Sequence, residues 1–211
     1  MAPAVVARPR CAGCATPVSS LPHPGFRCGA CRADPPPWIR AVAGIDYAYP
    51  WDRLVTAFKF GQRLDLAQVL LEPLRARLDA CPGAMQSGAP STPACLVPVP
   101  LAHERLRSRG YNQAWELARR LAREGGLPAC HDALFRVRET GHQLGLDRQA
   151  RRANLRDAFV VSPQRAARLR GSRVVLVDDV LTTGATARAA AQALLRGGAE
   201  EVEVWVIARA A

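Results

Sequence analysis

The stretch VVLVDDVLTTGAT, Val174 to Thr186, constrains the fold of this chain more than any other feature. Its first four residues are all apolar, which is typical of a strand buried on both faces in a parallel sheet. Two adjacent aspartates follow, Asp178 and Asp179, and then a Thr/Gly segment that leads into an alanine-rich helical pattern. Ligands of open α/β sheets bind beyond the carboxyl ends of the strands. The segment therefore predicts a ligand site at such an edge.

The residue types in this segment predict two parts of the ligand. Backbone N–H groups, threonine hydroxyls and the positive end of a helix dipole together bind phosphate. The hydroxyls are those of Thr182, Thr183 and Thr186, and Gly184 lets the backbone approach the phosphate closely. The two carboxylates would repel a phosphate, but they suit vicinal hydroxyls or Mg²⁺. A phosphate near a diol describes a ribose 5-phosphate, whereas the simpler interpretation is two solvated acids before a threonine N-cap.

Strand and helix patterns alternate along the rest of the chain. Apolar residues at helical spacing predict two helices within 51–80, separated at Gly61, and Asn112 is predicted to cap a further helix that ends at 125–126. The other predicted elements are an extended segment at 39–50, strands at 96–100, 133–138, 158–161 and 201–208, and a helix at 186–196. This alternation predicts an α/β fold with a parallel, doubly wound sheet.

Four cysteines near the N-terminus predict a small metal-bound module. Cys11, Cys14, Cys28 and Cys31 form two CxxC pairs, and four thiolates fill the coordination shell of a structural zinc ion. Disulfides and an iron–sulfur cluster are the alternatives. The three prolines of 33–38 form a stiff link. We therefore predict a zinc ribbon with its link at 1–37 and an α/β domain at 38–211.

The charge of the chain favours a partner that carries phosphate groups. The formal charge is +11, from 29 basic and 18 acidic residues, and every basic residue except Lys59 is arginine. Nucleic acid or a polyphosphorylated metabolite would suit this charge, although a GC-rich genome would also favour arginine. No apolar run reaches the roughly 18 residues of a membrane span, and the first residues lack the apolar core of a signal peptide. These features predict a cytoplasmic protein with reduced cysteines.

The Val174–Thr186 stretch resembles the 5-phosphoribosyl-1-pyrophosphate (PRPP) signature of type I phosphoribosyltransferases. Together with the cysteine pairs, AFKFGQ, VPVPL, RGYNQA and RRANLRDAF, it makes the chain similar to the ComF family. These are competence proteins linked to DNA uptake during natural transformation. The resemblance implies a type I phosphoribosyltransferase fold, which is a parallel doubly wound sheet with a hood, preceded by a four-cysteine zinc ribbon.

The same resemblance implies roles for individual residues. Asp178 and Asp179 would be the catalytic pair that holds the ribose hydroxyls or their Mg²⁺ shell, and 182–186 would hold the 5′-phosphate of PRPP. The segment 101–112 would be the loop that holds pyrophosphate. Its implied pyrophosphate contacts, together with one residue of the AFKFGQ motif, are Lys59, Arg105 and Arg109. The implied hood residues are Gln143, Arg151 and Asn154.

Two functions remain open from the sequence. The first is a phosphoribosyltransferase, in which Mg²⁺ and cationic side chains stabilise departing pyrophosphate and closure of the hood excludes water. The second is a protein that binds PRPP without catalysis and handles single-stranded DNA, which the charge and the zinc ribbon would suit. Consumption of PRPP in the presence of an acceptor distinguishes them. No residue pattern identifies the acceptor.

Overall fold

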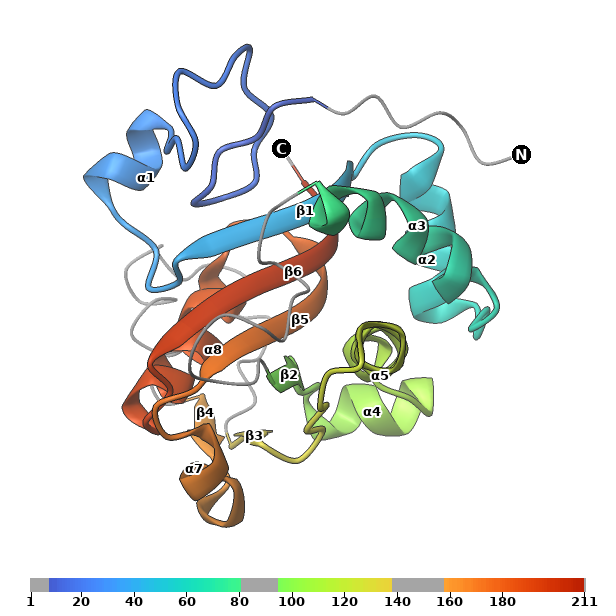
Figure 1. Ribbon diagram of the computed structural model, residues 1–211. Coiled ribbons are helices and arrows are strands. Elements are labelled where there is room, and N and C mark those ends of the chain that lie inside the picture. Colours follow the sequence, from blue (N-terminus) through green and yellow to red (C-terminus); the bar gives the residue numbers. More distant parts are fainter. Residues whose placement is uncertain (1–7, 81–94, 138–157, 211) are drawn as a thin grey trace, which may run out of the picture.

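A four-stranded parallel sheet forms the centre of the protein, in a computed structural model that describes residues 8–80, 95–137 and 158–210. The strands lie in the order β1-β6-β5-β2, and all neighbouring strands pair in parallel (Figure 1). Their bounds are Arg40–Asp46 for β1, Cys95–Pro98 for β2, Arg173–Leu181 for β5 and Glu201–Arg209 for β6. The parallel α/β sheet predicted from the sequence is confirmed.

The apolar residues of β5 and β6 are buried on both faces of the sheet. Val174 and Leu176 belong to one apolar cluster, while Val175 and Val177 belong to the cluster on the opposite face. This placement follows from the alternation of side chains along a strand. It explains why β5 is a continuous apolar run rather than an alternating one.

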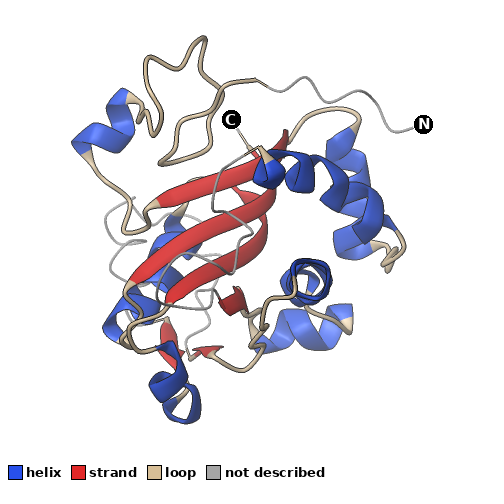
Figure 2. Cartoon of the chain, in the orientation of Figure 1, coloured by secondary structure: helices blue, strands red, loops and turns tan. Residues whose placement is uncertain are grey.

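Helices cover both faces of the sheet (Figure 2). Residues of α8 (Ala185–Arg196) pack in one apolar cluster, and residues of three helices pack in the other. These three are α2 (Trp51–Phe60), α3 (Leu66–Asp79) and α5 (Gln113–Gly125). The predicted cap of α5 is also confirmed, because Asn112 Oδ1 accepts the N–H of Ala114 at 2.9 Å.

Three short helices were not predicted, namely α1 (Gly29–Ala33), α4 (His103–Arg109) and α7 (Pro163–Leu169). The interpretation of 101–112 as a loop is wrong, because α4 fills most of it. Helix α4 has no buried residue, so it lacks the apolar periodicity by which helices are found in sequences. Strand β5, predicted to end with the two aspartates, continues beyond them, because it pairs with β6 as far as Leu181.

A second, two-stranded antiparallel sheet lies outside the main one. It consists of β3 (Leu134–Arg136) and β4 (Phe159–Val161), which the sequence predicted as strands. The predicted hood residues Gln143, Arg151 and Asn154 lie between these strands and outside the described residues. None of the helices in the described part of the chain has the length and apolar character needed to cross a membrane.

The N-terminal segment lies beside β1 at the edge of the sheet (Figure 1). Its backbone joins the strand directly, since the N–H of Ala41 donates to the carbonyl of Ala12 at 2.8 Å. Ala15 is buried in the same apolar cluster as Trp38 and α8. The segment before residue 38 therefore packs on the α/β domain.

Gly44 is the point where β1 approaches α3 most closely. A Cβ atom at this position would lie 2.7 Å from the backbone nitrogen of Leu74. Because backbone lines both sides of the contact, Gly44→Ala is expected to lower the free energy of unfolding by about 1–3 kcal/mol. Chemical denaturation measures this change. Gly29→Ala is the control, since its added Cβ would meet no atom within 4 Å, and equal losses in both variants would contradict the prediction.

Candidate functional site

The two aspartates near the end of β5 lie in different environments. Asp179 is only 4% exposed, and its Oδ1 atom lies 2.9 Å from Nζ of Lys59, which comes from the last turn of α2. Its Oδ2 atom is buried and has no hydrogen-bond partner among the described residues. Asp178 Oδ1 accepts the backbone N–H of Asp179 at 2.9 Å. The structure thus pairs Lys59 with Asp179 and leaves the other, buried oxygen of that carboxylate without a hydrogen-bond partner in the described part of the chain.

The surroundings of Asp178 disfavour its charged form. Burial raises the pKa of Asp178 to about 7, repulsion by Asp179 adds to this, and the positive charges of Lys59 and Arg136 oppose it. A cation or hydroxyl donors at this edge would therefore stabilise the carboxylate. Arg136 on β3 was missed by the sequence analysis. Nothing in the sequence places β3 near the end of β5.

The residues after β5 form the phosphate loop, which we define as Thr182–Thr186. Gly184 caps α8 with a φ of 77°, a left-handed conformation that favours glycine. The hydroxyl of Thr183 accepts the N–H of Ala185 at 3.4 Å. The first N–H groups of a helix have no partner inside it, so they are available to an anion. All five predicted phosphate contacts lie in this one turn, separated from the aspartates by two residues.

The RGYNQ motif joins α4, α5 and the end of α2. Gly110 ends α4 in a left-handed conformation, with a φ of 82°. The hydroxyl of Tyr111 donates to the carbonyl of Phe58, and Nδ2 of Asn112 donates to the carbonyl of Val99 at 3.1 Å. The motif therefore fixes the position of α4 relative to the ends of α2 and β2.

Arg105 and Arg109, both on α4, line a hollow of about 440 Å³ together with Phe60, Gln62 and Ser108. The guanidinium carbon of Arg109 lies 4.8 Å from the centroid of the Phe60 ring, and Phe60 is 69% exposed. Phe60 directly follows Lys59, which contacts Asp179. Of the three predicted pyrophosphate contacts, Lys59 is paired with Asp179, and Arg105 and Arg109 lie together at the hollow.

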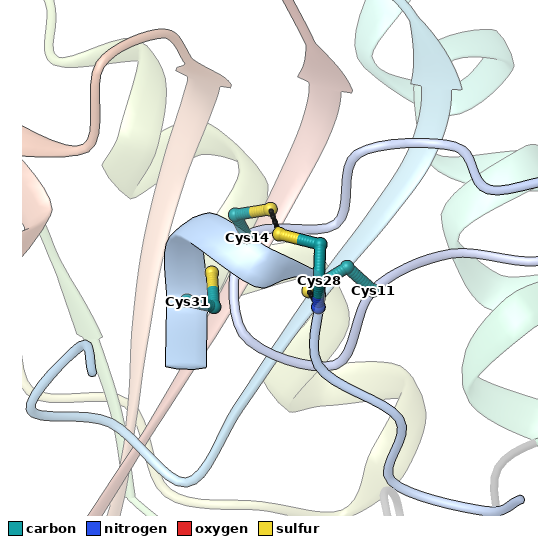
Figure 3. Close-up of side chains that lie close together, drawn as sticks. All are labelled: Cys11, Cys14, Cys28 and Cys31. Carbon is teal, nitrogen blue, oxygen red and sulfur yellow. Dashed lines mark hydrogen bonds between the residues drawn. The ribbon is translucent and has the colours of Figure 1, made fainter. Parts of the chain in front are cut away.

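The four N-terminal cysteines converge on one point (Figure 3). Their sulfur atoms all lie within 4.8 Å of one another, and the cysteines are free thiols. Sγ of Cys14 lies 3.7 Å from Sγ of Cys28. Sulfurs arranged tetrahedrally around zinc at about 2.3 Å would be about 3.8 Å apart. The arrangement fits a four-cysteine zinc site.

Backbone N–H groups favour the thiolate form of one of these cysteines, which is the form that binds a metal. Gly13 and Cys28 donate their N–H groups to Sγ of Cys11, at 3.3 and 3.1 Å. Although burial raises the pKa of Cys11, the N–H groups of Cys28, Cys14 and Gly13 lower it to about 7. By contrast, burial and the neighbouring sulfurs raise the pKa of Cys31, so that binding of a metal there must displace a proton. With four sulfur ligands no open position remains, which makes the site structural.

Comparisons with known proteins agree with these features. The family model described as "Phosphoribosyl transferase domain" matches residues 107–211. The chain is 37% identical to the DNA utilization protein YhgH of Salmonella typhimurium, over 94% of this chain and 83% of that protein. It is 34% identical to competence protein F of Haemophilus influenzae, over 95% of this chain and 90% of that protein.

Two more distant proteins also match. Competence protein ComFC of Bacillus subtilis is 33% identical over 54% of this chain and 44% of that protein. The solved structure of a B. subtilis glutamine PRPP amidotransferase covers 72% of this chain and 30% of its own, at 18% identity and a TM-score of 0.43. On the identity and coverage of the first two relatives, the chain belongs to the ComF family of competence and DNA utilization proteins, which have a type I phosphoribosyltransferase domain.

Proposed function

We propose that the protein binds PRPP together with Mg²⁺ at the carboxyl end of β5. The observation that carries this proposal is the buried carboxylate of Asp179, one oxygen of which has no hydrogen-bond partner among the described residues. It lies three residues before a Thr/Gly loop that caps α8. Oxygen ligands of this kind fit Mg²⁺ and ribose hydroxyls, and the loop fits a phosphate.

Each part of PRPP has a group of residues that suits it. The phosphate loop would bind the 5′-phosphate, and Asp178 and Asp179 would bind the ribose hydroxyls and Mg²⁺. Lys59, Arg105 and Arg109 would bind pyrophosphate. Lys59 pairs with Asp179 in the free protein, so ligand binding would exchange this carboxylate for a pyrophosphate oxygen. Mg²⁺, when bound, would neutralise part of the pyrophosphate charge.

We further propose that the bound PRPP donates its phosphoribosyl group. In such a transfer, the bond from the ribose C1 carbon to pyrophosphate breaks, and a bond from C1 to the acceptor nucleophile forms. The protein would hold the 5′-phosphate on the phosphate loop while the three cationic side chains stabilise the negative charge that develops on pyrophosphate. This chemistry needs no general base beyond what the acceptor requires.

Calorimetry with PRPP, in the presence and absence of Mg²⁺, tests the binding. We expect saturable binding that strengthens when Mg²⁺ is present, and weaker binding of ribose 5-phosphate, which lacks the pyrophosphate contacts. A chain that binds neither compound would refute the proposal. Release of pyrophosphate with candidate acceptors then separates an enzyme from a protein that only binds PRPP.

Thr186 provides the most direct test of the phosphate loop. Thr186→Val keeps the shape of the side chain but removes a hydroxyl, and a hydrogen bond to a charged acceptor is worth about 1.5–3 kcal/mol. We expect PRPP affinity in calorimetry to fall by about 10- to 150-fold. Thr56→Val, on the exposed side of α2, removes a hydroxyl away from the loop and serves as the control. Equal affinities of the two variants would place the phosphate elsewhere.

We also propose that the protein acts in the uptake or use of DNA, as the names of its relatives indicate for those proteins. The hollow around Phe60 favours direct contact with single-stranded DNA. An exposed aromatic ring beside two arginines combines a stacking surface for a base with cations for phosphates. The affinity should then fall with salt, with a log–log slope of about −0.7 for each phosphate contacted.

Phe60→Ala is expected to weaken single-stranded DNA binding by about 1–3 kcal/mol, the contribution of one stacked base. Fluorescence anisotropy with a labelled oligonucleotide measures the change. Tyr49→Ala is a matched control, because Tyr49 is 78% exposed and also has an arginine over its ring, Arg53 at 5.8 Å. PRPP should compete with the oligonucleotide if Arg105 and Arg109 serve both. Binding that depends on neither Phe60 nor PRPP would move the DNA contact to another surface.

A further inference from the structure

Arg209, at the end of β6, connects the four-cysteine cluster to the phosphate loop. Its Nε donates to Oγ1 of Thr16 at 3.2 Å, and its Nη1 donates to the carbonyls of Leu181 and Thr182 at 3.0 and 2.8 Å. Oγ1 of Thr16 also lies 3.2 Å from Sγ of Cys14. A continuous path of hydrogen bonds therefore runs from a cysteine of the cluster to the backbone at the start of the phosphate loop.

Trp38 forms a second connection between the same two regions. Its side chain is only 4% exposed, and its Nε1 donates to the carbonyl of Gly13 at 2.6 Å. Gly13 lies between Cys11 and Cys14 in the first CxxC pair. The far edge of the ring lies against Gly184, where an added Cβ would be 3.5 Å from Cη2 of Trp38. The indole is thus bonded to the cysteine pair and lies close to the phosphate loop.

A metal ion at the cluster would fix both connections at their N-terminal ends. A zinc-bound thiolate at Cys14 carries no proton, so the Thr16 hydroxyl must donate to it and can then only accept from Arg209. Without the metal, the short segment has few large apolar side chains to hold Thr16 and Gly13 in place. The phosphate loop would then lose two restraints. Ligand binding would have to order the loop, and the entropy cost of this ordering would lower the affinity.

We propose that Arg209 and Trp38 are positioning residues, which make phosphate binding at the loop depend on metal occupancy of the four-cysteine cluster. The proposal rests on the proposed binding of PRPP. It gives the zinc site a role in ligand binding at a distance, in addition to its role in holding the N-terminal segment. Coupling between two such sites commonly changes affinity by about 5- to 150-fold.

Arg209→Met tests the first connection, because it keeps the length of the side chain and removes the donors. We expect PRPP affinity in calorimetry to fall about tenfold, with one zinc per chain retained. Trp38→Phe keeps an aromatic ring, loses the donor to Gly13 and should have a smaller effect in the same direction. Arg165→Met is the control, since it removes an arginine that pairs with Asp132 in another part of the structure. Wild-type affinity in both test variants would overturn the proposal.

Zinc binding provides a reciprocal test, because two coupled sites change each other's affinity by the same factor. In competition with a chelating dye, PRPP should strengthen zinc binding to the wild-type protein. The effect should be lost in Arg209→Met and retained in Arg165→Met. If PRPP binds to the wild type but leaves its zinc affinity unchanged, the two sites are not coupled.

Hydrogen exchange tests the connection between the cysteine cluster and the phosphate loop without any ligand, and so independently of the proposed PRPP binding. We expect the amides of residues 181–186 to exchange faster when zinc is removed from the wild-type protein, with no ligand present. In Arg209→Met they should exchange fast even with zinc bound. A wild type that binds no PRPP but shows this change would refute the proposed ligand and support the connection. Exchange at 181–186 that is the same with and without zinc would overturn the connection.

Discussion

Cys31→Ser is expected to abolish metal binding and to unfold the segment before residue 38. Cys31 is one of four sulfurs that converge within 4.8 Å, and its side chain is buried. Structural zinc contributes about 10–16 kcal/mol to the folding of small zinc modules near neutral pH. The N-terminal segment places only a few apolar side chains in the core, so without the metal it would be held mainly by polar contacts with the α/β domain. We expect zinc content to fall from about one per chain to near zero.

The sheet itself should survive this loss. Its two apolar clusters are built almost entirely from residues 38–208, on strands and helices that do not involve the cysteines. Limited proteolysis should therefore cut Cys31→Ser within the first 37 residues and leave the rest resistant. Cys130→Ser is the control for the chemical change, because Cys130 lies in the core beside Cys95 and outside the cluster. A variant that lacks all four N-terminal thiols and still binds stoichiometric zinc would contradict the assignment.

The elements that the sequence predicted best are those whose buried residues follow a regular spacing along the chain. Strand β5 was predicted because both its faces are buried, which requires an unbroken apolar run. Helix α5 was predicted because Asn112 caps it and its buried residues recur at helical spacing. Helix α4 was missed because every one of its residues is at least partly exposed. Its position depends on Tyr111 and Asn112, which bond to residues far away in the sequence.

The candidate site was predictable in its residue types and not in its pairings. Only Val180 and Leu181 separate the aspartates from the phosphate loop, so one stretch of sequence contains them. Lys59 entered the prediction by resemblance, as a pyrophosphate contact, and its ion pair with Asp179 joins residues that only the fold brings together. Trp38 and Arg209 donate mostly to backbone carbonyls. Because any residue offers a carbonyl, no sequence pattern marks such contacts.

Replacing both aspartates, Asp178→Asn with Asp179→Asn, is expected to have the largest effect on PRPP binding. Each substitution removes a charged partner for hydroxyls or Mg²⁺, and contacts of this kind are worth about 1.5–3 kcal/mol each. PRPP affinity in calorimetry should fall by at least about 100-fold. Asp65→Asn is the control, because it makes the same change of charge at an exposed pair with Arg63. If the double variant binds PRPP as the control does, the carboxylates are not part of the site.

The single variant Asp178→Asn should also stabilise the free protein at neutral pH. Burial raises the pKa of Asp178 to about 7, whereas an unfolded chain has a value of about 3.9. Between these pH values the folded wild type keeps a proton that the unfolded chain has released, so its free energy of unfolding falls as pH rises and levels off above about 7. Because the asparagine side chain does not titrate, the free energy of unfolding of the variant does not fall in this way. Denaturation without Mg²⁺ or PRPP should show nearly equal stability at about pH 4 and an advantage for the variant on the order of a few kcal/mol at about pH 8. A variant that is less stable than the wild type at pH 8 would show that Asp178 has a stabilising partner in the free protein. In that case the carboxylate would not lower the stability of the free protein, and the idea that it is kept there for a ligand at a cost in stability would be wrong.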